Sequence, residues 1–314
     1  MAYLSRKRIK GNDYLYAVRS FRLPDGKTAK ISKRVADAKE AKGLDGFFDK
    51  RQSEVLAAHM KKSYSPMKLR DPKALEKIEL MSLEYRRILS KLSQNQARDL
   101  FDRFTANFTY ESNALEGNSL TLKEVAIVIH ENKSIPGKDL REIYETKNSR
   151  KVVDMILKKR FRIREPDVLK MHSMLVQNMD IPAGYKKFPN YLHGRQLVTT
   201  PPEKVPEAMK ELFRWFEKNR RTTHPLKLAA GLHGRFEQIR PFEDGNGRVG
   251  RFMVNVILAN ANYPPLIIRK TQRLSYFNAL SDFDEGRTGT LGEFLYHRFC
   301  ETNEKFFKIY VKYL

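Results

Sequence analysis

The turn at residues 239–251 constrains the fold of this chain more than any other segment. It reads Ile-Arg-Pro-Phe-Glu-Asp-Gly-Asn-Gly-Arg-Val-Gly-Arg and lies between two stretches of helical apolar periodicity, Pro225–Ile239 and Asn246–Asn260. We therefore expect two helices joined by a short glycine turn. The glycines allow positive φ and bring backbone N–H groups toward one point, where the positive end of the second helix adds to them.

The residues of this turn have the chemistry of a polyphosphate site. Arg248 and Arg251 are three positions apart, so both are expected on one face of the helix. Asp244 precedes them, and a carboxylate beside a backbone anion site and two arginines suits a metal-bound polyphosphate. The alternative is an ordinary turn between helices with solvated arginines, because Gly-Asn-Gly is a common turn sequence.

The string from Pro241 to Arg251 resembles the signature of the Fic family, His-Pro-Phe-x-(Asp/Glu)-Gly-Asn-Gly-Arg-x-x-Arg. The resemblance covers about Phe104 to Tyr296. It implies a mainly α fold in which helices surround a central helical hairpin that carries the signature, with a β-hairpin flap over the active site. One position departs from the signature, because Arg240 stands where the family has histidine.

The resemblance also implies an activity, which is transfer of AMP from ATP to a Ser, Thr or Tyr hydroxyl of a protein. Under it, Asp244 binds Mg²⁺, and Arg248 and Arg251 hold the β- and γ-phosphates of ATP. The flap, residues 187–198, would dock an extended segment of the target protein by backbone pairing. The remaining expected ATP contacts are the turn residues Gly245, Asn246 and Gly247, and Tyr276 in the adenine pocket.

Arg240 occupies the position of the family's general base. The histidine that the family has at this position has an unperturbed pKa of about 6.5, so it can accept a proton at neutral pH. A guanidinium stays protonated and has no acceptor lone pair. His233 lies about 10 Å upstream along the helix, and we expect it to be structural. We therefore predict ATP–Mg²⁺ binding with little transfer. Arg240 is either a substitution that disables the enzyme or the residue of a naturally non-catalytic relative.

A second motif lies upstream, at Ser112 and at Glu116 followed by Gly117. It resembles the Fic inhibitory motif, (Ser/Thr)-x-x-x-Glu-(Gly/Asn), which implies that Glu116 reaches Arg251. A carboxylate on Arg251 would remove the cation that holds the γ-phosphate and add a repelling charge. From the local sequence alone, Ser112 could cap a short helix that Gly117 ends, leaving Glu116 as a solvated acid.

The N-terminal region has a different pattern from the helical remainder. Tyr14–Leu23 and Thr28–Val35 predict a β-hairpin, with Arg6–Lys10 as a possible third strand and a helix within Ala36–Lys62. We divide the chain into an accessory region (1–62), a linker with a leading helix (63–103) and a Fic domain with C-terminal helices (104–314). Two short strands are expected within residues 191–198.

Charge is concentrated in the N-terminal region. The whole chain has a net charge of +23, and residues 1–70 contain 18 Lys or Arg against 7 Asp or Glu. This excess favours acidic partners such as nucleic acid, although a solubility charge, or a small sheet used for packing or dimer contacts, is an equally simple interpretation. A homo-oligomer is compatible with the sequence.

Three functional alternatives stay open beside AMP transfer. The same residues could remove AMP from a modified protein, transfer another group such as phosphate, phosphocholine or UMP, or sense a nucleotide in a nucleic-acid-binding regulator. No apolar run has the length of a membrane span, and the first ten residues lack an apolar signal-peptide region, so we expect a cytoplasmic protein without a membrane partner. Cys300 is the only cysteine, which excludes an internal disulfide.

Overall fold

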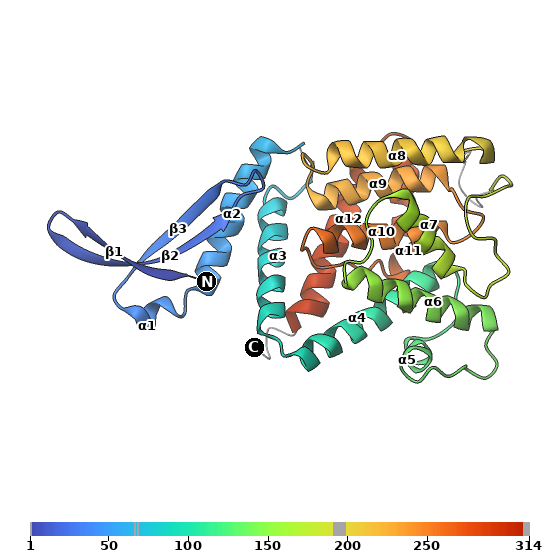
Figure 1. Cartoon of the computed structure of the whole chain (residues 1–314), viewed down its shortest axis with the longest axis horizontal. Coiled ribbons are helices and arrows are strands. Elements are labelled where there is room, and N and C mark those ends of the chain that lie inside the picture. The colour runs from blue at the N-terminus through green and yellow to red at the C-terminus, as the bar shows by residue number, and fades with distance from the viewer. Residues whose placement is uncertain (1, 66, 68, 191–198, 310–314) are drawn as a thin grey trace.

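The computed structural model describes residues 2–65, 67, 69–190 and 199–309. Figure 1 shows a body of helices from which a small antiparallel sheet projects on one side. The predicted fold class, mainly α with a small N-terminal sheet, is confirmed. The two strands expected within residues 191–198 lie outside the described residues.

The N-terminal sheet has three strands, β1 (Tyr3–Ile9), β2 (Asn12–Arg22) and β3 (Thr28–Val35), in the order β1-β2-β3. The predicted third strand is therefore present and begins earlier than expected. The helix predicted within Ala36–Lys62 is two helices, α1 (Ala38–Ala41) and α2 (Asp45–Ser63).

One face of the sheet packs on α2. Ala17 and Val35 form a small core with Leu44 and Phe48. Beside this core, Arg19 donates to Asp45 at 2.8 Å and to Asp49 at 2.6 Å. Buried apolar contact and a partly buried ion pair therefore fix the sheet to α2.

The helical body begins after a linker, at residue 74. Its longer helices are α3 (Ala74–Lys91), α4 (Gln94–Leu115), α5 (Leu122–His130), α6 (Leu140–Leu157), α7 (Glu165–Leu175), α8 (Val205–Asn219), α9 (Pro225–Ile239), α10 (Asn246–Asn260), α11 (Arg273–Asp284) and α12 (Gly289–Thr302). The α9–α10 pair has the bounds that the sequence predicts. Helix α12 ends at Thr302, and a π-helical turn, Asn303–Phe307, follows it.

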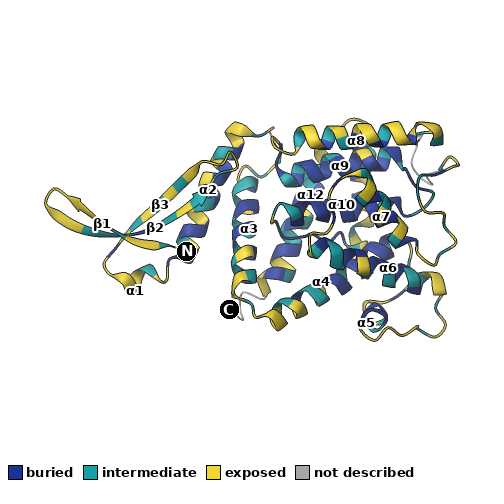
Figure 2. Cartoon of the chain, viewed as in Figure 1, coloured by how far each residue is buried: buried dark blue, intermediate teal, exposed yellow. Residues whose placement is uncertain are grey.

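Helix α10 forms the centre of the body, as Figure 2 shows by its almost uniform burial. Its residues are mostly apolar on every side, which is typical of a helix enclosed by others. Helix α9 packs directly against it, and the two form the central hairpin that carries the signature turn. No helix among the described residues is both long and apolar enough to cross a bilayer.

The close packing of α9 on α10 depends on Gly250. A methyl group at this position would lie 2.6 Å from Nδ1 of His233 and 2.9 Å from a carboxylate oxygen of Glu237. Gly250→Ala is therefore expected to lower the free energy of unfolding by about 1–3 kcal/mol, as in other overpacked cores. Gly292→Ala in α12 is the control, because its methyl group would meet no atom within 4 Å, and helix propensity predicts slight stabilisation. Thermal denaturation measures both, and equal melting temperatures for the two variants would contradict this packing.

Candidate active site

The signature turn is closed by the side chain of Asn246. Its Oδ1 accepts from the backbone N–H of Phe242 at 2.9 Å, and its Nδ2 donates to the Phe242 carbonyl at 2.7 Å. Gly245, the N-cap of α10, has φ of +78°, which the turn requires. Asn246 is 1% exposed, so its amide shapes the loop, and the side-chain contact to phosphate expected from the sequence has no support in this geometry.

A buried histidine that the sequence did not identify as a site residue supports the same turn. His172 of α7 stacks on the Phe242 ring, with 3.8 Å between ring centroids. Its Nδ1 accepts from the N–H of Gly184 at 3.4 Å, which leaves Nε2 to donate to the Asp244 carbonyl at 3.1 Å. Burial lowers the pKa of His172 to about 4, so the ring is neutral at pH 7. Both nitrogens are engaged, and His172 therefore positions the turn.

Asp244 presents a partly exposed carboxylate at the mouth of the turn. Its Oδ1 accepts from the N–H of Gly245 at 2.6 Å, and its Oδ2 pairs with Arg141 of α6 at 2.7 Å. Among the described residues no group of three acidic, histidine or cysteine side chains is clustered for a metal ion. A single carboxylate still fits Mg²⁺, which is held in many nucleotide sites by one or two carboxylates together with phosphate oxygens.

Arg248 lies beneath Asp244 and is 1% exposed. Its Nη1 is 3.3 Å from Glu145 of α6, and its Nη2 is 3.6 Å from Oδ2 of Asp244. Glu145 also accepts from Nδ2 of Asn118 at 2.9 Å. Arg141 and Glu145 could not be identified from the sequence, because both lie in an ordinary charged helix far from the signature in the chain.

Arg251 is held by the upstream motif. Its Nε donates to Oγ of Ser112 at 3.1 Å, and its Nη2 donates to the Ser112 carbonyl at 2.8 Å. The same Nη2 lies 2.8 Å from Oε1 of Glu116, so the expected contact between these two residues is present. Ser112 lies inside α4 and is buried, and the expectation that it caps a short helix is wrong.

The Glu116 carboxylate also covers the backbone of the turn. A methyl group built on Gly247 would lie 2.2 Å from Oε1 of Glu116 and 2.8 Å from Nη1 of Arg251. Glu116 is the C-cap of α4, and Gly117 follows with φ of +101°, which turns the chain toward α6. Past this turn, Glu142 accepts from the N–H and the hydroxyl of Ser119 at 2.5 and 3.0 Å. The Glu116 carboxylate thus occupies the surface that Gly247 leaves open.

Arg240 ends α9 in the left-handed conformation, with φ of +45°. Its Nη1 lies 3.4 Å from Glu237, one turn back on the same helix, and the side chain is 21% exposed. His233 is fully buried and its Nε2 is 2.7 Å from the hydroxyl of Tyr276, in agreement with a structural role. Tyr276 is also fully buried, beneath Arg251, so the adenine contact expected of it has no support from its position.

Comparison with known proteins identifies the domain. Residues 162–258 match the sequence model of the Fic/DOC family. The chain contains a Fic/DOC family domain. Protein adenylyltransferase Fic of Drosophila melanogaster is 30% identical over 181 residues, which are 56% of this chain and 37% of that protein. Protein adenylyltransferase Fic of Drosophila sechellia matches with the same values, so the chain spans only about a third of the length of these relatives.

Solved structures show the same fold. A Fic domain containing signaling protein from Bacteroides thetaiotaomicron has a TM-score of 0.65 and 25% identity, over 72% of this chain and 94% of that chain. Fic-1 from C. elegans has a TM-score of 0.65 and 22% identity, over 87% of this chain and 77% of that chain. The helical body and its central hairpin are therefore those of Fic structures.

The described end of the expected flap is attached to the Fic signature. The backbone N–H of Lys186 donates to the Pro241 carbonyl at 2.8 Å, and Nδ2 of Asn190 donates to the carbonyls of Phe242 and Glu243. Nζ of Lys186 is buried and donates to Oδ1 of Asn190 at 2.6 Å. Burial, with a smaller contribution from nearby Arg240, lowers the pKa of Lys186 to about 8. Residues 191–198 of the expected flap lie outside the described residues.

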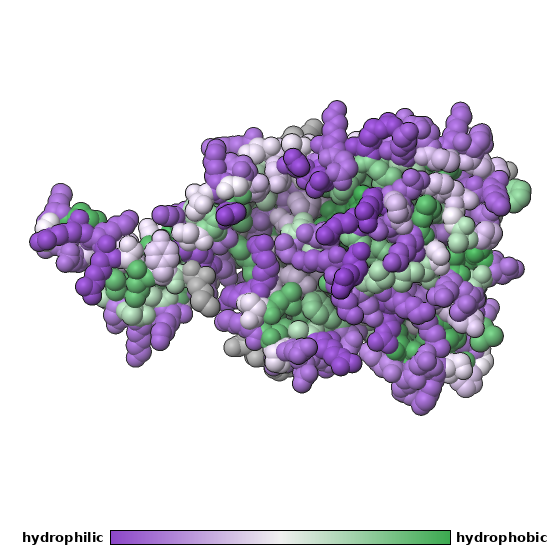
Figure 3. Space-filling view, viewed as in Figure 1, coloured by the Kyte–Doolittle hydropathy of each residue, from purple (hydrophilic) through white to green (hydrophobic). Residues whose placement is uncertain are grey.

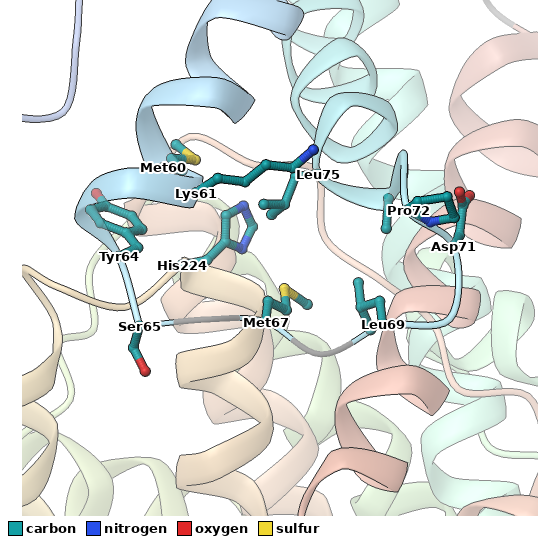
Figure 4. A pocket seen from close by; sticks show the side chains of 11 residues that line it. Met60, Lys61, Tyr64, Ser65, Met67, Leu69, Asp71, Pro72, Leu75 and His224 are labelled. Atoms are coloured by element: carbon teal, nitrogen blue, oxygen red, sulfur yellow. The ribbon is translucent and has the colours of Figure 1, made fainter.

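A separate cavity of about 160 Å³ lies at the junction between the N-terminal region and the Fic domain. Figure 4 shows Met60, Lys61 and Tyr64 of the N-terminal segment lining this cavity together with His224, the N-cap of α9. Arg240 caps the other end of α9, a helix of 15 residues, so about 22 Å of helix separates this cavity from the signature turn. The cavity is therefore not the site formed by the Fic signature.

Proposed function

We propose that this chain is a Fic-type protein adenylyltransferase whose ATP site is complete except for its general base and is restrained by Glu116. The observation that supports this most directly is the grouping of Asp244, Arg248 and Arg251 around the turn at the start of α10, with the Glu116 carboxylate on that same surface. A carboxylate held against a backbone anion site and a buried arginine occupies a position suited to a phosphate oxygen.

The residues at the turn have separate roles in this proposal. Asp244 would hold Mg²⁺, which neutralises phosphate charge as the bond to the leaving pyrophosphate breaks. Arg248 and Arg251 would hold the β- and γ-phosphates, and the N–H groups of Gly245 to Gly247 would orient them. Since phosphoryl-type transfer relies mainly on alignment and charge stabilisation, this set supplies most of what the reaction requires.

The acceptor would be a Ser, Thr or Tyr hydroxyl of a protein that docks along the 187–198 segment. The described part of this segment, residues 187–190, lies next to the signature through the contacts of Asn190 and of Lys186, which immediately precedes it. The hydroxyl must lose its proton as it attacks the α-phosphate, and Arg240 cannot accept that proton. We therefore propose that the chain as written binds ATP and transfers AMP very slowly.

The metal role of Asp244 gives a binding prediction. In the Glu116→Gly background, Asp244→Asn is expected to weaken ATP affinity about tenfold or more when Mg²⁺ is present, because a charge-assisted contact is lost. Without Mg²⁺ the two proteins should bind ATP with similar, low affinity. Isothermal titration calorimetry with and without Mg²⁺ measures this difference.

Asp37→Asn is the matched control for this experiment. Asp37 also accepts from backbone N–H groups at a helix start, that of α1, but it lies in the N-terminal region. Its replacement should leave the Mg²⁺ dependence of ATP binding unchanged. If Asp244→Asn keeps the full Mg²⁺ enhancement of ATP affinity, the metal assignment is wrong.

A further inference from the structure

The two faces of the N-terminal sheet are chemically different. Residues directly opposite in neighbouring strands share a face, so the register assigns Leu15, Ala17 and Val35 to the face that packs on α2. The alternate residues form the opposite face, which we call the outer face. In β3 the burial pattern alternates strictly, and its outer-face residues are all exposed.

The outer face is basic and free of acidic strand residues. Lys7 of β1, Arg22 of β2, and Lys30 and Arg34 of β3 all belong to it, and all four are exposed. Across the described strands there are eight Lys or Arg and one acid, Asp13. Asp13 is two residues before Leu15 in β2 and therefore lies on the same face, toward α2. The charged strand residues of the outer face are thus all positive.

Tyrosine rings support two of these cations. The guanidinium of Arg34 lies 4.1 Å from the ring centre of Tyr14, and Nζ of Lys7 lies 5.1 Å from that of Tyr16. A cation stacked on a ring has less freedom and keeps its N–H groups directed outward for an anion. Four hydroxyl residues also belong to the outer face and lie next to its basic residues in the strand or across from them: Ser5, Ser20, Thr28 and Ser32.

The shape and position of the sheet also favour an extended anionic partner. Figure 1 shows the sheet standing away from the helical body, and Figure 3 shows hydrophilic residues over most of this projection in the same view. Because neighbouring strands are about 4.8 Å apart, the axes of β1 and β3 lie about 10 Å apart. The major groove of B-form DNA is about 12 Å wide and is entered by β-ribbons and β-sheets in known binding modes.

We propose that the outer face of this sheet binds double-stranded DNA in the major groove. Lys7, Lys30 and Arg34 contact phosphates on either side of the groove. Exposed Tyr3 and Ile9 of β1 provide apolar surface of the kind that contacts thymine methyl groups. This function is independent of the proposed AMP transfer, because the sheet and the signature turn share no residue.

DNA fits this surface better than duplex RNA. The major groove of A-form RNA is deep and narrow, and side chains on a sheet cannot enter it. The four exposed cations match the repeating negative charges of a DNA backbone, which release counterions when they are neutralised. DNA affinity is therefore expected to fall steeply with salt concentration.

The test measures binding of the full chain to a fluorescently labelled, mixed-sequence DNA duplex by anisotropy over a salt series. Replacing Lys7, Lys30 and Arg34 with glutamine is expected to weaken DNA binding at least about tenfold and to reduce the slope of log K against log salt by about 2–3. A duplex RNA of the same sequence should bind more weakly than DNA.

A control triple variant removes the same charge elsewhere. Lys204, Lys210 and Lys218 are exposed at or just before α8 on the Fic domain, and their replacement by glutamine should change neither the DNA affinity nor the slope appreciably. A single Lys30→Glu variant tests whether the loss of binding comes from unfolding of the sheet. Its melting temperature should be unchanged, and its DNA binding should still be weakened. Equal losses in the two triple variants, equal binding of duplex RNA, or no loss with Lys30→Glu would each overturn the proposal.

Discussion

Arg240→His is expected to increase AMP transfer by this chain by about 10²–10⁴-fold, the range that a positioned general base contributes. Under the proposed function the parent chain supplies the other requirements, which are the turn, two buried arginines and a partly exposed carboxylate. A neutral imidazole can accept the hydroxyl proton that a guanidinium cannot. Incubation with α-labelled ATP and a protein lysate, followed by gel electrophoresis, measures the transfer.

The backbone at position 240 allows this replacement. Arg240 has φ of +45°, a conformation in which histidine is found more often than most residues. Its side chain is partly exposed and turned toward Glu237, so a smaller ring meets no packed core. Transfer by the histidine variant should rise with pH through the pKa of the new imidazole, since only its neutral form accepts a proton. The parent should show no such rise.

Arg220→His is the matched control for Arg240→His. Arg220 also caps a helix C-terminus, that of α8, and pairs with a glutamate three residues earlier, at 2.6 Å. It lies away from the signature, so its replacement should leave transfer at the parent level. Equal labelling by the parent and Arg240→His would show that the base assignment is wrong.

The two central helices could be predicted because their apolar periodicity is regular and a glycine turn separates them. The α9–α10 hairpin was expected at its observed bounds, since Pro225 starts one helix and the glycine turn separates it from the next. The break between α1 and α2 was not predicted, because the Ala- and Lys-rich segment there has no strong apolar pattern.

Only those residues of the candidate site that lie together in one short sequence motif could be predicted. The arginines and Asp244 follow from the signature, whereas His172, Arg141 and Glu145 reach the turn from α6 and α7 through tertiary packing. The direction in which a side chain points could not be predicted from the sequence either. Asn246 and Tyr276 were expected to face ATP, and burial directs them into the protein instead.

Glu116→Gly is expected to increase ATP affinity about 10–100-fold, and in the Arg240→His background to increase transfer further. Removing the carboxylate breaks the ion pair with Nη2 of Arg251, which keeps its bond to the Ser112 carbonyl, and uncovers the backbone of Gly247. A hydrogen bond to a charged group contributes about 1.5–3 kcal/mol, which corresponds to this range of affinity. Calorimetric titration of ATP–Mg²⁺ into the parent and the variant measures the change.

Glu285→Gly is the control, because Glu285 is likewise the C-cap of a helix, α11, and is followed by a glycine with positive φ. It therefore reproduces the backbone change without touching the signature turn, and ATP affinity should stay at the parent value. The unliganded Glu116→Gly protein should also lose about 1–3 kcal/mol of stability, because Arg251 stays buried without its carboxylate partner. ATP–Mg²⁺ should then raise its melting temperature more than that of the parent.

Glu116 could act through Arg251 or by covering Gly247, and a double-mutant cycle separates these effects. If the restraint acts through Arg251, Glu116→Gly improves ATP affinity in the parent but hardly changes it in an Arg251→Ala protein, because no arginine is left to release. If the carboxylate blocks the backbone of the turn, the improvement persists without Arg251. We expect the first result, because Ser112 fixes Arg251 through two hydrogen bonds beside the carboxylate, and the guanidinium is buried at the point where it must meet a phosphate. An undiminished effect of Glu116→Gly in the Arg251→Ala protein would assign the restraint to the turn backbone instead.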